Sequence, residues 1–202
     1  MKLSVSYHQM VLLYRILYGT LLPIELCWYS LLATINDIDN SDLKPDNVGF
    51  NFEGRVKLFD FGLAKELDPL QKTTDGMYEM SGGTGSRRFM APEVALGQPY
   101  NLSADIYSFS ILFWELVALE KAFGKLSQDE HRENVIKKND RPILKREWRP
   151  AIQYILQNCW KRNPRERTSA KELYMQLKEQ VDSYYHNGFE SYEEGRERKM
   201  CI

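Results

Sequence analysis

The chain has 202 residues, of which 43% are hydrophobic, and this is enough to build one ordinary core. Its 27 basic and 28 acidic residues nearly cancel, so the charge predicts neither a nucleic-acid partner nor attraction to an anionic membrane. The three cysteines show no metal-type or redox-type spacing, which is typical of a reduced intracellular protein, and we expect a cytoplasmic location.

Residues 1–41 predict one or two helices that are interrupted near Gly19 or Pro23. Within them, residues 10–35 are mostly apolar and long enough to cross a bilayer. Arg15 and Glu25 interrupt this stretch, and a charge at the centre of the hydrocarbon layer is expensive. We therefore expect a packed helical segment here, with membrane association as the minor alternative.

The next part of the chain predicts loops around one small hairpin. Residues 38–47 are polar and contain a proline, which favours a loop. Residues 48–59 predict a short β-hairpin, because Val56 and Leu58 alternate with a polar residue in its second arm. Residues 63–89 are rich in Gly, Ser and Thr, so we expect a long loop, and such loops in compact domains are usually functional.

Two different helices are predicted after this loop. Residues 104–118 are almost continuously apolar, which is typical of a helix that is buried on all sides. Residues 127–138 are polar and predict an exposed helix, and Ser127 with Glu130 has the form of a capping box at its start.

Two further helices are predicted before the tail. Residues 148–160 carry apolar side chains at helical spacing. Residues 170–181 follow a serine that can cap them, and we expect Leu173, Met175 and Leu177 on or near one face.

The tryptophans and the paired arginines of the chain have ordinary interpretations. Trp114, Trp148 and Trp160 have apolar neighbours and are expected in the core rather than in a binding platform. Arg87 and Arg88 could dock an acidic partner, but solvated loop charge is the preferred interpretation.

Two carboxylates, one amide and one lysine lie close together in the sequence. Asp42, Lys44 and Asn47 belong to the stretch Asp-Leu-Lys-Pro-Asp-Asn, and Asp60 begins the Asp-Phe-Gly motif that follows. These groups can hold a divalent metal on a polyphosphate and accept a proton from a hydroxyl. Alone, one motif could be a turn after a strand and the other a helix cap before a proline. Their order and spacing, followed by Ala-Pro-Glu ending at Glu93, are hard to obtain by chance.

Together these motifs resemble the catalytic half of the eukaryotic protein kinases. The resemblance implies that Asp42 is the catalytic base and that Lys44 contacts the transferred phosphate of ATP. It also implies that Asn47 and Asp60 hold Mg²⁺, with Lys44 completing the cofactor-binding set. A lysine at residue 44 is usual in kinases that act on serine and threonine, whose substrates are proteins.

Further matches extend the resemblance beyond the catalytic motifs. Phe61 and Gly62 complete the Asp-Phe-Gly motif and are implied to be structural. The segment from Phe89 to Val94 and the Cys159-Trp160 pair are most similar to the tyrosine-kinase-like group of serine/threonine kinases.

Four other residues match family positions that organise the site. Ser86 matches a residue that contacts the base and the lysine near the substrate. Asp105 matches a buried helix aspartate that ties down the backbone of the catalytic loop. Arg167 matches the arginine that pairs with the glutamate of Ala-Pro-Glu, here Glu93.

The sequence departs from the family just before Asp42. Asn40 and Ser41 stand where the family has histidine and arginine, and Asp39 stands where an apolar residue is expected. The arginine normally clasps a phosphorylated loop, so its replacement makes such phosphorylation less suited to act as the switch.

The small β-rich lobe of the family is expected to be absent from this sequence. Before Lys44 there is one lysine, Lys2, one glycine, Gly19, and one glutamate, Glu25. These cannot supply a Gly-rich loop, a strand lysine and a helix glutamate together.

We therefore expect a mainly α fold, the large C-terminal lobe of a protein kinase, with a short β-hairpin that carries the catalytic and metal-binding loops. The expected division is a non-matching apolar helical segment (1–41), the kinase lobe (42–182) and a polar, disordered tail (183–202).

The functional prediction is a serine/threonine protein kinase that uses ATP and Mg²⁺ and is weak or inactive as a truncated catalytic domain. The alternative is a pseudokinase-like protein-interaction module without turnover. The sequence predicts no oligomeric state.

Overall fold

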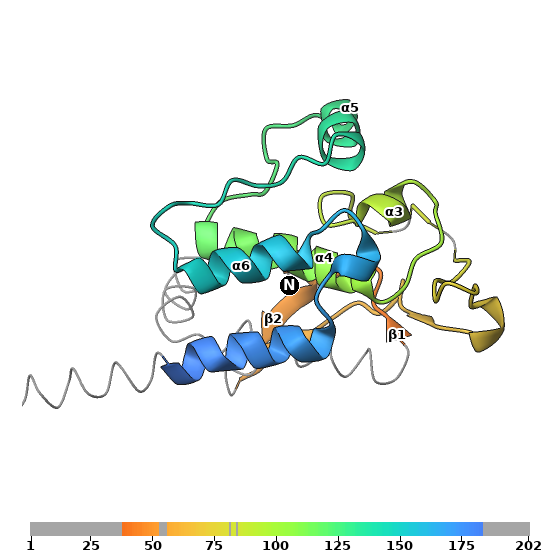
Figure 1. The fold of residues 1–202 in the computed structure, drawn as a ribbon, viewed down its shortest axis with the longest axis horizontal. Helices are drawn as coiled ribbons and strands as arrows, with labels where there is room; N and C mark the ends of the chain where they lie inside the picture. Colours follow the sequence, from red (N-terminus) through yellow and green to blue (C-terminus); the bar gives the residue numbers. More distant parts are fainter. Residues whose placement is uncertain (1–37, 53–55, 81, 84, 184–202) are drawn as a thin grey trace, which may run out of the picture.

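The structure is a computed structural model and describes residues 38–52, 56–80, 82–83 and 85–183 (Figure 1). The strands are β1 (Ile38–Asp39), β2 (Val48–Phe50), β3 (Val56–Leu58) and β4 (Lys65–Glu66); the helices are α3 (Pro92–Ala95), α4 (Ser103–Ala118), α5 (Gln128–Glu130), a π-helix (His131–Lys137), α6 (Pro150–Cys159) and a last helix over residues 170–183, with short 3₁₀ turns at Pro45–Asn47, Pro69–Gln71 and Pro164–Glu166. This mainly helical architecture with little sheet agrees with the expected fold class.

Most of the predicted first segment and tail lie outside the described residues. The apolar stretch 10–35 is among them, as is the chain after residue 183. Within the described ranges, no helix combines the length and the apolar character needed to cross a bilayer.

The described strands form two small antiparallel sheets. In the first, β2 pairs with β3, with Val48 opposite Leu58 and Phe50 opposite Val56, so the predicted hairpin is confirmed. In the second, β1 pairs with β4, with Ile38 opposite Glu66. A loop was expected at both of these strands. That expectation was wrong, because a two-residue strand leaves no alternating pattern to detect.

Helix α4 forms the centre of the core. Eleven of its 16 residues are buried, as its nearly continuous apolar sequence predicts. It packs beside α6, as Figure 1 shows, and fully buried side chains such as Ile111 and Leu156 come from both helices. The core is therefore built around one helix, to which the loops of the site attach.

The tryptophans belong to this core, as expected. Trp114 and Trp160 are buried, and Trp148 packs against the core from a partly exposed position. The rings of Trp114 and Trp148 meet edge to face with centroids 6.1 Å apart, a favoured aromatic arrangement. None of these three side chains forms an exposed binding platform.

The capping box at α5 is present as predicted. The Ser127 hydroxyl accepts from the Glu130 N–H at 3.3 Å, and the Glu130 carboxylate accepts from the Ser127 N–H at 2.8 Å. The helix continues as the π-helix, and its residues Val135 and Ile136 are buried. The expectation of an exposed helix over residues 127–138 was therefore wrong at its end, where these two apolar residues turn inward.

The last helix also begins with reciprocal hydrogen bonds, here between Ser169 and Glu172 at 2.9 and 3.2 Å. Leu173 and Leu177 are buried, four residues apart, whereas Met175 is 56% exposed. The prediction that Met175 lies near the buried face was wrong. At 3.6 residues per turn, a step of two residues leads to the opposite side of a helix.

Candidate active site

The loop that carries Asp42 is held by the first turn of α4. The backbone N–H of Asn40 donates to Oδ2 of Asp105 at 2.8 Å, which is the tie that the resemblance implied. The N–H of Asp42 donates to the carbonyl of Asn40 at 2.8 Å, and Ser41 between them has a φ of 58°. Because a left-handed serine is uncommon, this tight turn is a strained feature beside the candidate base.

Asp42 is the centre of a hydrogen-bonded cluster. Its Oδ2 lies 2.5 Å from Nζ of Lys44 and 3.2 Å from Nδ2 of Asn47, and its Oδ1 accepts from the N–H of Ser86 at 2.8 Å. The structure thus brings four of the predicted site residues into direct contact.

The environment of Asp42 favours its ionised form. Burial opposes ionisation, but the hydrogen bonds from Lys44 and Ser86 outweigh it and lower the pKa of Asp42 below its ordinary value. The carboxylate is therefore charged at neutral pH and able to accept a hydrogen bond from a hydroxyl.

Gly85 closes this cluster and was not singled out in the sequence. It has a φ of 95°, and a Cβ at this position would lie 2.3 Å from the carbonyl oxygen of Ser41 and 3.3 Å from Oδ1 of Asp42. Only glycine fits both the backbone conformation and this close approach. The sequence signal was a glycine directly before Ser86.

Asn47 and Asp60 have the ligand types that Mg²⁺ prefers. Asn47 is buried, and its amide nitrogen also donates to the carbonyl of Asp42 at 2.9 Å, so its Oδ1 is directed away from that residue. The N–H of Phe59 donates to the carbonyl of Asn47 at 2.8 Å, which brings the Asp-Phe-Gly motif beside it. An amide oxygen and a carboxylate from neighbouring segments fit a hard cation.

Asp60 is exposed, and the residue before it is hydrogen-bonded through its backbone to Asn47. Asp60 has a φ of 59°, and its Oδ1 accepts from the N–H of Gly62 at 3.3 Å within its own turn. Phe59, Phe61 and Leu63 around it are 51%, 57% and 37% exposed. The segment that carries Asp60 therefore presents apolar side chains to solvent.

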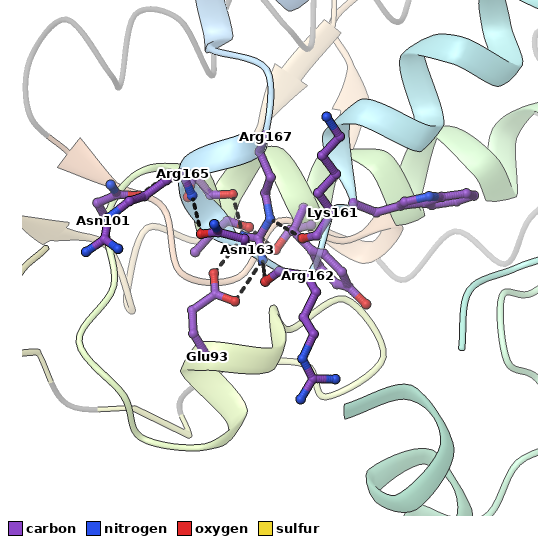
Figure 2. Close-up of polar contacts among 12 residues, drawn as sticks. Glu93, Asn101, Lys161, Arg162, Asn163, Arg165 and Arg167 are labelled. Carbon is purple, nitrogen blue, oxygen red and sulfur yellow. Dashed lines mark hydrogen bonds and ion pairs between the residues drawn. The ribbon is translucent and has the colours of Figure 1, made fainter. Parts of the chain in front are cut away.

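Glu93 and Arg167 form the expected structural pair (Figure 2). Nη1 of Arg167 lies 2.6 Å from Oε1 of Glu93, and Nη2 lies 2.8 Å from Oε2. The same guanidinium donates to the carbonyls of Lys161 at 2.9 Å and Ser103 at 3.0 Å, and it lies over the Tyr107 ring. Because its donors are used in this way, a fully buried charge is stable here.

Asp39 is a buried carboxylate for which sequence reasoning predicted no partner. It is 1% exposed and accepts from the Ser41 hydroxyl at 2.5 Å and the Tyr100 hydroxyl at 3.3 Å. Tyr100 in turn exchanges backbone hydrogen bonds with Tyr78, at 2.8 and 3.2 Å. These contacts connect the turn before Asp42 to the long loop over residues 63–89.

Burial shifts the titration of two neighbouring carboxyl groups. It raises the pKa of Asp39, and hydrogen bonds from Ser41 lower that pKa by less. Burial, and then repulsion from Asp39, raises the pKa of Asp105 well above its ordinary value. Both groups therefore resist ionisation, in contrast to Asp42.

Arg87 is an exposed loop charge, as expected, and its Nη1 contacts the neutral Oε1 of Gln128. Arg88 differs from the expectation, because it is half-buried and its Nη1 lies 3.7 Å from Oε1 of Glu115.

Comparison with known families decides the relationship of this chain. The protein kinase domain family matches residues 35–177. The chain belongs to this family. The matched residues of this kinase domain include the Asp42 cluster and the pair formed by Glu93 and Arg167.

Individual relatives of this kinase domain agree with the family match. The chain is 36% identical to the dual specificity protein kinase shkB of Dictyostelium discoideum over 140 residues, which are 68% of this chain and 21% of that protein. It is 32% identical to the serine/threonine-protein kinase STY17 of Arabidopsis thaliana over 146 residues, 72% of this chain and 24% of that protein. It is 35% identical to the serine/threonine/tyrosine-protein kinase HT1 of Arabidopsis thaliana over 126 residues, 62% of this chain and 30% of that protein. The aligned regions thus span less than a third of each of these relatives.

Proposed function

We propose that this chain is the large lobe of a protein kinase that transfers the terminal phosphoryl group of ATP to serine or threonine hydroxyls of proteins. The observation that carries the proposal is the cluster in which Lys44, Asn47 and Ser86 all contact the carboxylate of Asp42. The names of the matching relatives, which include serine/threonine and dual specificity kinases, support this substrate class.

In this proposal Asp42 orients the accepting hydroxyl and receives its proton. The hydroxyl oxygen forms the new bond to the terminal phosphorus, the bond from that phosphorus to the bridging oxygen breaks, and ADP leaves with the electron pair. A carboxylate that is already ionised is suited to accept the proton late in this step.

Lys44 and Ser86 would fix the reacting groups. The Lys44 ammonium, 2.5 Å from Asp42, adds a positive charge where charge develops on the transferred oxygens. The N–H of Ser86 holds the other carboxylate oxygen, so the base keeps one orientation.

Asn47 and Asp60 would hold Mg²⁺ through an amide oxygen and a carboxylate. Bound there, the ion would offset the negative charge of the phosphate oxygens. The hydrogen bonds of Asn47 to Asp42 orient its amide group for this role.

A phosphate-transfer assay with radiolabelled ATP tests the proposal. We expect weak transfer by the chain alone, because a phosphoryl donor held from one side loses most of its positioning. A version with a kinase small lobe fused before Ile38 should be more active, and Asp42→Asn should remove that activity. Robust transfer by the chain alone that depends on Asp42 would contradict the expected weakness, and transfer that survives Asp42→Asn would contradict the role of the base.

A pseudokinase-like interaction module is the second candidate. It is favoured by the solvent-exposed side chain of Phe61. Titration calorimetry with Mg²⁺ and ATP separates the two functions. Heat of binding that is reduced in Asp60→Asn supports the kinase, whereas no binding at millimolar nucleotide supports the module.

A further inference from the structure

A cavity of about 270 Å³ lies between the loop that precedes α3 and the helical segment of α5 and the π-helix. Met90 and Ile136 contribute apolar walls, and both are buried. Arg87, Asp129 and Arg132 line the same cavity and are exposed. The cavity therefore combines an apolar floor with a charged rim.

This cavity adjoins the candidate base. Ser86 donates its N–H to Oδ1 of Asp42, and Arg87 is the next residue along the same loop. An extended polypeptide advances about 3.3 Å per residue. A chain whose hydroxyl lies at Asp42 would therefore reach the cavity within a few residues.

The size of the cavity selects the kind of occupant. Pockets that enclose drug-sized molecules or cofactors usually measure about 300–1,000 Å³. At about 270 Å³ this cavity is slightly smaller, and it is open to solvent through its charged rim. A single side chain of a bound polypeptide fits it better than a nucleotide does.

The charge of the rim selects the chemistry of that side chain. Arg87 and Arg132 provide two positive charges against the one negative charge of Asp129. The neighbouring Arg88 does not add to this excess, because it pairs with Glu115. The cavity thus keeps a net positive charge.

The present partner of Arg87 is replaceable. Its guanidinium contacts the neutral amide oxygen of Gln128. A carboxylate forms a stronger, charge-assisted hydrogen bond with arginine than an amide oxygen does, and its two oxygens match the fork of the guanidinium. An acidic side chain that enters the cavity can therefore displace Gln128 with a gain in binding.

His131 in the wall leaves this charge balance unchanged. Burial, and then the proximity of Arg88 and Arg141, lowers the pKa of His131, so its ring is neutral at pH 7. Its Nε2 is buried and, within the described part of the chain, has no hydrogen-bond partner.

We propose that this cavity binds an acidic side chain of the phosphate-accepting protein, a few residues from the accepting hydroxyl, and that Arg87 and Arg132 select it. The inference rests on the proposed function for the direction in which the substrate runs. It adds a preference for carboxylate side chains that the kinase family alone does not specify.

A binding experiment tests this without requiring turnover. Fluorescein-labelled peptides with one serine carry a single Glu at the first, second, third or fourth flanking position on either side, and matched peptides carry Gln or Lys there. Fluorescence anisotropy with the full chain measures their affinities. At one flanking position we expect Glu to bind about fivefold tighter than Gln, with Lys weakest, and the preference should shrink in high salt.

Three variants assign the preference to the cavity. Arg132→Gln and Arg87→Gln should each reduce the preference for Glu over Gln, and Asp129→Asn should increase it. Lys171→Gln, which removes an exposed charge from the last helix, is the matched control and should leave it unchanged. Thermal unfolding of each variant checks that the fold is intact.

Equal affinity for Glu and Gln peptides at every position would overturn the proposal, as would an unchanged preference in the variant that carries both Arg87→Gln and Arg132→Gln. Failure of this proposal about the cavity can be distinguished from failure of the proposed function. A preference for Glu without any phosphate transfer would leave the cavity assignment standing, whereas transfer to peptides without any such preference would leave only the kinase function.

Discussion

Arg167 and Glu93, 74 positions apart in the sequence, form a buried ion pair with two parallel hydrogen bonds. Their side chains are 0% and 5% exposed. The pair fastens α3 to the loop before the last helix, and the bond from Arg167 to the carbonyl of Ser103 adds the start of α4. One side chain therefore connects three segments around the site.

Arg167→Ala should destabilise the fold by about 3–5 kcal/mol, because it leaves the Glu93 carboxylate buried without its partner. The free energy of unfolding in urea measures this loss. Arg165→Ala is the control in the same loop. Arg165 pairs with Asp75 at the surface, where both side chains are about half exposed, so this change should cost no more than about 1 kcal/mol. Equal losses in the two variants would contradict the structural role of Arg167.

Gly85→Ala should be much more damaging than Gly83→Ala. Both glycines have positive φ, 95° and 73°, so both substitutions cost about 1–2 kcal/mol in backbone conformation. Only at Gly85 would the new methyl group collide with a backbone atom, the carbonyl oxygen of Ser41, whereas nothing lies within 4 Å at Gly83. Urea unfolding of both variants gives the difference. The prediction fails if Gly83→Ala is the less stable of the two.

Asp39→Asn should change how stability depends on pH. A carboxyl group whose pKa is raised in the folded state stabilises it at low pH, and this contribution is lost as the pH rises from the ordinary value of 3.8 through the raised pKa. The amide that replaces the Asp39 carboxyl in this variant cannot ionise, so the substitution also removes the repulsion that raises the pKa of Asp105.

The unfolding free energies of the original chain and of Asp39→Asn should therefore be compared at pH 4.5 and pH 7.5. The advantage of the original chain over the variant should be larger at the lower pH. Groups such as His131 titrate in both proteins and cancel in this comparison. A difference that is the same at both pH values would show that Asp39 ionises normally in the fold.

Ser127→Ala should cost about 1 kcal/mol, because it removes the side-chain acceptor for the N–H of Glu130 at the start of α5. A double-mutant cycle with Glu130→Ala tests whether the two halves of the capping box act together. If the stability losses of the two single variants add up to the loss in the double variant, the reciprocal hydrogen bonds are independent. Thr74→Ala, on an exposed loop, is a control expected to stay within about 0.5 kcal/mol.

The sequence predicted those elements whose signals are local. The hairpin β2–β3 showed alternation in one arm and a turn, and α4 showed a long apolar run. The pairing of β1 with β4 could not be predicted in this way. Each strand has two residues, and Ile38 pairs with Glu66 from the far side of the intervening hairpin, so no local pattern marks either strand.

The candidate site also has a part that the sequence predicted and a part that it did not. Asp42, Lys44 and Asn47 lie in one motif, and their contacts span five residues or fewer, so the motif predicted the cluster. Asp39 was noticed only as an unexpected charge. Its partner Tyr100 lies 61 positions away, and no local pattern connects the two. The contact exists because the loop before α4 returns to the turn before the base.

The exposed phenyl rings of Phe59 and Phe61, with Leu63 beside them, have a practical consequence for handling the protein. Exposed apolar surface promotes aggregation in water, because two such surfaces that meet remove apolar area from solvent at about 25 cal/mol per Å². Sedimentation across a dilution series should therefore precede every titration, since aggregated protein would lower the apparent binding of both nucleotide and peptide. Phe61→Ser is expected to keep the material dispersed at higher concentration.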